Sequence, residues 1–294
     1  METVEHLKRR IESTEDLQSV VKTMKALAAV KIRQFERAAE SLEDYHQTVV
    51  MGLCALFRSG GADRAILRTA PGRTPGCVVF GSDQGMCGQL NDQVVAHTLT
   101  YLEELGVDPA ERVVLAVGER ARSRLEEQGQ PVEATMAVPG GVDGITPRVR
   151  DLLQKITVWQ ERGVARVILF HSEPLSGASY RPRTVRLLPL DRAWIRQLQE
   201  TPWPTRALPF FRGDPQGLFS GLIREYLFAG LFRAFAQSLA SENASRLASM
   251  QGAEKNIEER LAELQNRFHQ QRQMSITEEL LDIVAGFEAL QEEA

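Results

Sequence analysis

The stretch of residues 241–268 reads SENASRLASMQGAEKNIEERLAELQNRF. Its first half consists mainly of small side chains. Its second half places apolar side chains at Ile257, Leu261, Leu264 and Phe268. Steps of three and four residues put these side chains along one side of a helix, which is the pattern of a coiled coil. Because small residues let two helix axes approach closely, we expect a long helix packed tightly against a second one.

The apolar stripe starts within this stretch and extends beyond it toward the end of the chain. It begins at Leu247 and Met250, and after a one-residue shift it resumes at Ile276, Leu280, Ile283, Phe287 and Leu290. No proline follows Pro215, so nothing in residues 214–294 forces a helix to end. The sequence therefore predicts a C-terminal coiled-coil helix over residues 214–294.

The start of the chain has the same character. Residues 1–51 contain neither glycine nor proline. The apolar positions are Val4, Leu7, Ile11, then Leu17, Val21, Met24, Ala28, and then Ile32, Phe35, Ala39, Leu42, Val49, Leu53 and Leu56. His46 lies on this stripe, and we interpret it as a polar residue tolerated in the core. An N-terminal helix over residues 1–58 could bury its stripe most economically against the C-terminal helix, in antiparallel orientation.

The centre of the chain alternates strand and helix patterns. Short apolar runs predict buried parallel strands at 77–82, 112–118 and 165–171, with helices at 89–105, 119–128 and 146–162. Further strands are expected at 132–138 and 184–190. The predicted fold class is therefore α/β: a long antiparallel two-helix coiled coil with an inserted Rossmann-like α/β domain over residues 74–190. Residues 191–213, which contain several prolines, are interpreted as the connector to the last helix.

Composition excludes several classes of protein. The 294 residues carry a formal net charge of −4, so the basic excess of a general nucleic-acid binder is lacking. The cysteines, three in number, form neither a disulfide framework nor a zinc pattern. The first ten residues are too charged for a secretory signal. Arg224, Glu225 and Arg233 interrupt the apolar run 217–240, which is therefore not expected to cross a membrane.

Possible catalytic residues in the centre form weak patterns. The loop 81–88 reads GSDQGMCG between a strand and a helix, but its glycine spacing matches no nucleotide-binding motif, and we interpret it as a tight turn. His171 and Glu173 end a strand without an identifiable nucleophile. Cys87 is interpreted as a small buried residue rather than a reactive thiol. We expect no catalytic residue, metal or cofactor.

Two polar clusters on the helical arms are better candidates for a functional surface. Lys22, Lys25, Lys31, Arg33 and Arg37 form a basic stretch in the first arm. In the last arm, Gln273 and Thr277 share one helix face next to Arg272. On these patterns alone, either cluster could equally be plain solvent-exposed surface.

Four segments resemble the γ subunit of F-type ATP synthases. They are SVVKTMKALAAVKIR (19–33), SDQGMCGQLN (82–91), LASENASRLASM (239–250) and RQMSITEELLDIVAG (272–286). The resemblance covers the chain in the right order. Gln84 and Gln89 depart from the family pattern, in the central domain only. The first segment also resembles γ chains of an alternate bacterial subgroup, some of which are thought to move sodium, and the sequence does not choose between proton and sodium.

The resemblance implies a non-catalytic rotor shaft. Its coiled coil would turn inside a ring of α and β subunits, and its α/β domain would contact the ε subunit and the ring of c subunits. The chain would lie at the cytoplasmic face of the bacterial inner membrane, attached only through the complex. The residues matching the family's contacts with β are Lys22, Met24, Lys25, Lys31, Arg33, Arg272, Gln273 and Thr277. The alternatives are a stand-alone coiled-coil adaptor carrying an α/β domain, and a small nucleotide-dependent enzyme.

Overall fold

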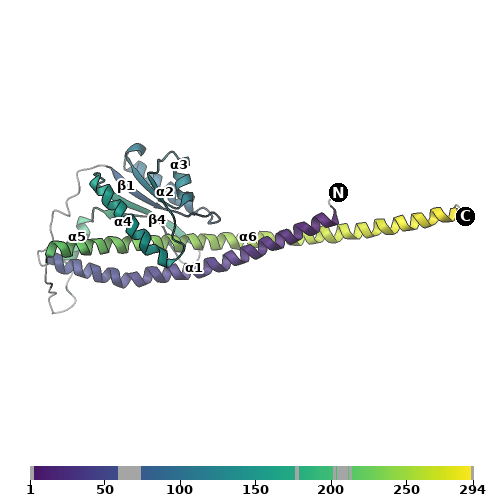
Figure 1. Ribbon diagram of the computed structural model, residues 1–294, viewed down its shortest axis with the longest axis horizontal. Helices are drawn as coiled ribbons and strands as arrows, with labels where there is room; N and C mark the ends of the chain where they lie inside the picture. Colours follow the sequence, from purple (N-terminus) through teal and green to yellow (C-terminus); the bar gives the residue numbers. More distant parts are fainter. Residues whose placement is uncertain are drawn as a thin grey trace. The chain divides into compact units, whose positions relative to one another are not determined.

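The computed structural model describes residues 3–58, 74–175, 179–200, 203, 211 and 214–292, without the side chains of Arg192 and of residues 286–292. Two long helices dominate it: α1 (Val4–Arg58) and α6 (Pro215–Glu292) (Figure 1). The chain divides into two compact units. We call residues 1–27 with 248–294 the coil unit, and residues 28–247 the sheet unit.

The coil unit consists of the start of α1 and the last part of α6, which run in opposite directions (Figure 1). Leu7 of α1 and Met250, Leu261 and Leu264 of α6 are buried, so the predicted stripe of residues 247–268 does form a seam. Leu17, by contrast, is 56% exposed, because the stripe of α1 slips at this point and turns the side chain away.

The later part of the α6 stripe differs from the prediction. Ile276, Leu280 and Ile283 are 47%, 57% and 69% exposed, so their side chains do not pack in a seam within the chain. An apolar stripe indicates that a helix face packs against a partner, but it does not specify whether the partner belongs to the same chain. Phe287 and Leu290, which continue the predicted stripe, lie among the residues without described side chains.

The sheet unit contains one five-stranded sheet in the order β3-β2-β1-β4-β5. Strands β1 (Pro75–Phe80), β2 (Val113–Val117), β3 (Ala134–Met136) and β4 (Arg166–Pro174) are parallel, whereas β5 (Tyr180–Leu188) pairs antiparallel with β4. The connecting helices are α2 (Leu90–Glu104), α3 (Glu119–Glu127) and α4 (Ile145–Glu161). Short 3-10 helices occur at Pro109–Glu111 and Val142–Gly144. The strands and helices expected from sequence are thus present, with ends shifted by a few residues.

Both faces of the sheet are covered. Alternate residues of β1 point to opposite sides, so Val78 and Phe80 join the cluster formed with α4, α6 and Phe35 of α1, while Cys77 and Val79 join the cluster under α2 and α3. The long helices therefore form one outer layer of the sheet unit (Figure 1). This packing holds α6 against the parallel sheet.

The segment interpreted as a connector contains helix α5 (Arg192–Glu200). Ile195 and Leu198 of α5 are buried with Leu53 and Phe57 of α1 and Phe219 of α6. The prolines that suggested an irregular connector are Pro202, Pro204 and Pro209, which lie outside the described residues and beyond the end of α5. The predicted connector thus includes a packed helix, which the sequence patterns did not indicate.

Gly118 joins β2 to α3, and its substitution by alanine is expected to destabilise the sheet unit strongly. Its φ is +101°, and an added Cβ would lie 2.7 Å from backbone atoms of Ser82. We expect Gly118→Ala to cost about 3 kcal/mol or more, measured by urea unfolding of the purified chain. The matched control is Gly129→Ala, where φ is +79° but nothing lies within 4 Å. Equal stability losses for the two variants would show that the close approach to Ser82 does not matter.

Candidate functional site

The basic stretch predicted as a partner contact begins in the coil unit. Lys22 is exposed and Met24 is half-buried. Lys25 donates a hydrogen bond through Nζ to Oε2 of Glu254 at 2.5 Å, and the Glu254 side chain is only 16% exposed. Lys25 thus ties α1 to α6 inside the coil unit. A contact of Lys25 with another subunit would have to compete with this ion pair.

The basic stretch continues into the sheet unit. Arg33 and Arg37 are exposed, and Lys31 is half-buried. Lys31 lines a cavity of about 120 Å³ together with Asp83, Glu242 and Arg246. The predicted basic residues therefore differ in availability: Lys22 and Arg33 are exposed, whereas Lys25 and Lys31 lie next to carboxylates of this chain.

The second predicted cluster lies near the end of α6. Arg272 and Gln273 are exposed, and Thr277 donates through Oγ1 to the backbone oxygen of Gln273 at 2.9 Å. Arg272 lies 18 residues beyond Glu254, the partner of Lys25, which is about 27 Å along a helix. The structure therefore presents two separate candidate contact surfaces on the coil unit and does not bring them together.

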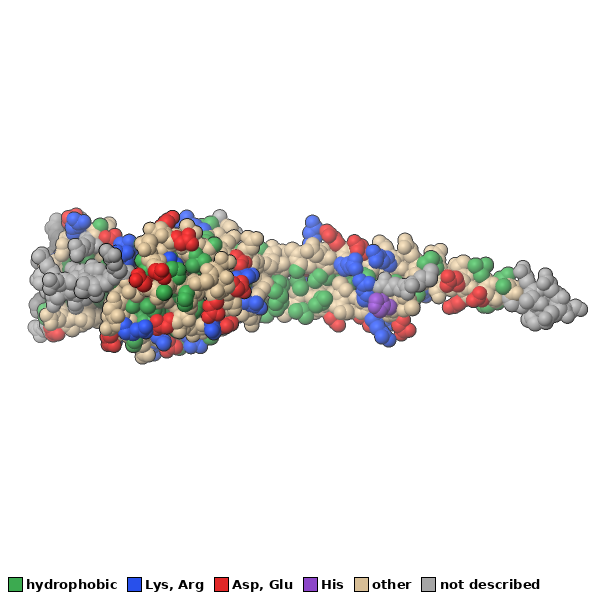
Figure 2. Space-filling model, turned by 90° about the horizontal axis from the view of Figure 1, so that it is seen from above, with side chains coloured by type: hydrophobic (Ala, Val, Ile, Leu, Met, Phe, Trp, Pro, Cys, Tyr) green, Lys and Arg blue, Asp and Glu red, His purple; other side chains and the backbone are tan. Residues whose placement is uncertain are grey.

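Sequence reasoning missed the surface next to Arg272. Met274, Ile276, Leu280, Leu281, Ile283 and Val284 are all at least 45% exposed. Figure 2 shows hydrophobic side chains on the surface beside the grey C-terminal residues. Exposed apolar groups gathered in this way mark an interaction surface. The available signal was the stripe itself, which the prediction assigned to packing within the chain.

The glycine-containing loop 81–88 forms hydrogen bonds to residues of α2 and α6. The Ser82 backbone N–H donates to Oδ1 of Asn91 at 3.0 Å, and Asn91 Nδ2 donates to Ser82 Oγ at 2.9 Å. Ser245 of α6 donates through Oγ to the Cys87 backbone oxygen at 2.5 Å. Cys87 itself is buried. The loop is therefore a structural turn that contacts α6.

Asp83 ties three loops together at the carboxyl end of the sheet. Its Oδ1 accepts from the Glu119 backbone N–H at 3.1 Å, and its Oδ2 accepts from that of Val138 at 2.8 Å. The Glu119 N–H belongs to the first residue of α3, where a bound phosphate would otherwise find a donor. A carboxylate fixed at this position repels a phosphate.

The pair His171 and Glu173 is split between two environments. His171 is 2% exposed and lies edge-on to Phe80, and burial lowers its pKa to about 4. Burial acts to raise the pKa of Glu173, but Arg181 and Arg183 outweigh it and hold that pKa below its usual value. Arg181 donates to Glu173 Oε2 at 2.9 Å. His171 is thus a buried neutral imidazole, whereas Glu173 belongs to a charged cluster that links β4 to β5.

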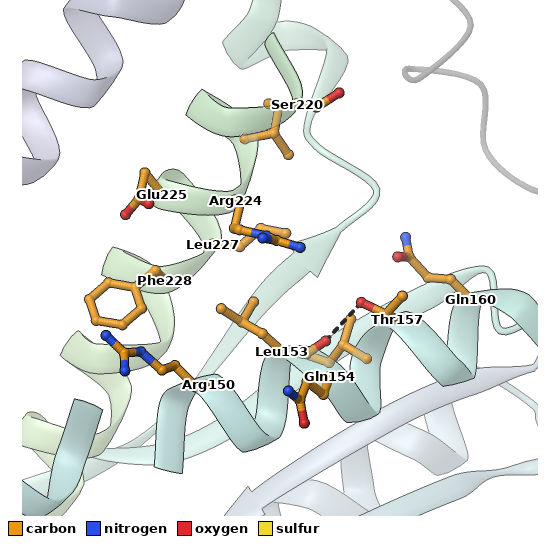
Figure 3. Close-up of a pocket in the computed structure, with 12 residues that line it drawn as sticks. Arg150, Leu153, Gln154, Thr157, Gln160, Ser220, Arg224, Glu225, Leu227 and Phe228 are labelled. Carbon is orange, nitrogen blue, oxygen red and sulfur yellow. Dashed lines mark hydrogen bonds between the residues drawn. The ribbon is translucent and has the colours of Figure 1, made fainter. Parts of the chain in front are cut away.

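A groove of about 540 Å³ lies between α4 and the first turns of α6 (Figure 3). Arg224 extends toward α4, where Leu153 and Thr157 line the groove, while Glu225 points away from it. The Glu225 carboxylate accepts from the Tyr45 hydroxyl at 2.6 Å, and this hydrogen bond raises the pKa of Tyr45 to about 12. The groove mixes apolar and basic groups without forming a nucleophile–base pair among its lining residues.

Fold and site together define a class: a two-helix coiled coil that carries an α/β domain and exposes apolar and basic surfaces on its helices. The chain belongs to the family described as ATP synthase, whose model matches residues 3–290. It is 27% identical to the ATP synthase gamma chain of Cyanothece sp. and 26% identical to that of Nostoc sp.. In both cases 99% of this chain and 100% of the relative are covered.

Solved structures with the same fold come from ATP synthases. The chain matches a subunit of the Euglena gracilis mitochondrial ATP synthase with a TM-score of 0.65 at 17% identity, covering 98% of this chain and 94% of that one. A central-stalk chain from Tetrahymena thermophila gives a TM-score of 0.57 at 20% identity, covering 80% and 99%. The predicted family and fold class are thereby confirmed. No described helix is long and apolar enough to span a bilayer.

Proposed function

We propose that this chain is the γ subunit and central rotor shaft of an F-type ATP synthase. In that role it couples ion flow through the membrane sector to ATP synthesis or hydrolysis on the β subunits, and it carries no catalytic residues of its own. The relatives named gamma chain and the central-stalk structure support this assignment. We further propose that the chain lies at the cytoplasmic face of the bacterial inner membrane, held there by the ε subunit and the c-subunit ring.

The exposed apolar stripe of α6 is the observation that carries the proposal. Ile276, Leu280 and Ile283 lie on one helix face and are largely exposed in the chain alone. A surrounding α/β ring would cover this face without requiring a fixed partner residue, which suits a shaft that turns. Each shaft orientation would then favour a different conformation of the nearest catalytic site, so that the coupling is allosteric.

Co-purification tests the assignment. The tagged chain, expressed with α and β subunits, is expected to elute in a complex of three α, three β and one γ-type chain. Recovery of the chain as a homodimer that ignores α and β would support the adaptor alternative. Micromolar binding of ATP or NAD to the isolated chain in calorimetry would support the enzyme alternative, which the carboxylate of Asp83 at the start of α3 opposes.

Arg272 and Gln273 are proposed to contact β-subunit loops, along with Thr277 and, in the basic stretch, Lys22, Met24, Lys25, Lys31 and Arg33. Because a hydrogen bond to a charged group contributes about 1.5–3 kcal/mol, we expect Arg272→Ala with Gln273→Ala to lower ATPase turnover about tenfold in an intact complex. ATP-driven ion pumping should fall in parallel. The control is Arg267→Ala with Gln265→Ala, which removes similar exposed groups five and eight residues earlier on α6. Unchanged turnover in the test variant would exclude these contacts.

A further inference from the structure

Glu242 of α6 is a buried carboxylate with one unused oxygen. The residue is 6% exposed, and its Oε1 accepts from Nη2 of Arg246 at 2.7 Å. Its Oε2 is buried and has no hydrogen-bond partner among the described residues. A buried carboxylate is costly unless its oxygens are paired, so an unpaired oxygen indicates that a donor belongs at this position.

The cavity beside Glu242 limits what this donor can be. It measures about 120 Å³ and is lined by charged groups from three elements: Lys31 of α1, Asp83 of the loop after β1, and Glu242 with Arg246 of α6. Asp83 is already satisfied, because its two oxygens accept from the backbone N–H groups of Glu119 and Val138. Glu242 is therefore the carboxylate at this cavity with an oxygen that still lacks a donor, and Lys31 is an ammonium group that lines the same cavity.

The antiparallel pairing of the two long helices brings Lys31 and Glu242 to the same cavity. Within the sheet unit, Glu43 of α1 pairs with Arg233 of α6. Lys31 lies twelve residues back from Glu43 and Glu242 lies nine residues forward from Arg233, so the two differ in position along the helices by about one turn.

We propose that the free oxygen of Glu242 binds the ammonium group of Lys31. This ion pair joins α1 to α6 inside the sheet unit. Lys25 forms an ion pair with Glu254, so two lysines of the basic stretch each bind a carboxylate of their own chain. In the assembled enzyme, and therefore resting on the proposed function, Lys31 alternates between Glu242 and the acidic surface of a partner subunit. Lys22 and Arg33 are exposed, form no ion pair with a carboxylate of the described residues, and stay available throughout.

The electrostatics of the site agree with this pairing. Burial raises the pKa of Glu242, and Asp83 adds to the shift, whereas Arg246 and Lys31 oppose it. A cation that enters the cavity therefore relieves the cost of keeping this carboxylate charged.

Acetylation of lysines in the isolated full chain tests the contact between Lys31 and Glu242 without any partner subunit. An ammonium held on Glu242 must leave before its amine reacts with N-hydroxysuccinimidyl acetate. Replacing Glu242 by glutamine should therefore speed labelling of Lys31 about tenfold, measured by mass spectrometry against exposed Lys155 of the same unit. The control is Glu43→Gln, which removes a carboxylate that pairs with Arg233 and does not line the cavity. An unchanged ratio of Lys31 to Lys155 labelling in Glu242→Gln would overturn the proposal and would leave a water molecule as the donor.

A second measurement avoids any change to the buried carboxylate. Lys31→Met removes a cation that favours the charged form of Glu242, so it should lower the melting temperature more at about pH 8 than at about pH 4, because raising the pH favours that charged form. Arg33→Met, on the exposed side of the same helix, should show no such pH dependence. Equal effects of Lys31→Met at both pH values would contradict the proposal. Because both measurements use the isolated chain, they can fail while assembly with α and β succeeds, and the reverse.

Discussion

Leu264→Asp is expected to open the coil unit while leaving the α/β domain folded. Leu264 is 1% exposed in the seam between α1 and α6, so an aspartate there would bury an unpaired charge and remove a packed side chain. Such a change costs roughly 4 kcal/mol or more, a large part of the stability of a small unit. Hydrogen exchange should therefore rise in residues 4–27 and 248–285 and stay slow in the strands of the sheet unit.

Leu281→Asp is the matched control for this experiment. Leu281 lies on the same helix and is 62% exposed, so the new charge remains in water and the exchange pattern should match that of the unmodified chain. If Leu264→Asp left exchange in both coil segments unchanged, the helices would not be held together by this seam. If it also unfolded the strands, the two units would not be energetically separate.

The sequence could predict the elements because their signals are local. An apolar run such as 77–82 bounded by turn residues favours a buried strand wherever it lies, and the long stripes of the two arms favour helix without knowledge of the partner. The lysine contacts were not predictable in the same way. Whether Lys25 faces Glu254 depends on how two segments far apart in the sequence align, and a one-residue shift would turn the side chain to another face.

Asp83 illustrates a second limit. Sequence patterns placed it in a loop between strand and helix, where phosphate-binding glycines commonly lie. Its role became visible only when the structure brought the backbone N–H groups of Glu119 and Val138 to its two oxygens. Residues that bind backbone atoms of distant loops leave no periodic or spacing signal in the sequence. The same holds for Glu242, whose unpaired oxygen is a property of the packed structure.

Replacing Ile276, Leu280 and Ile283 by serine is expected to leave the isolated chain unchanged and to impair the assembled enzyme. All three side chains are largely exposed in the chain alone, so the melting temperature should not fall. In the complex, a partner that covers the stripe would lose its apolar contacts. Burying one such side chain contributes about 1.5–3 kcal/mol, so partial coverage of three supports a fall of at least about tenfold in ATPase turnover.

The control for this triple variant replaces Glu278, Glu279 and Asp282 by serine. These acidic residues are exposed on the same stretch of α6, so the control matches the number of substitutions and their effect on helix propensity. Turnover and ATP-driven ion pumping are measured together on complexes of confirmed stoichiometry. A specific loss in the apolar variant would show that a ring of partner subunits covers the stripe that α6 leaves exposed. If both variants kept full turnover and pumping, the stripe would not be a contact surface, and the coupling between shaft and ring would have to rest on Arg272, Gln273 and the basic residues of α1.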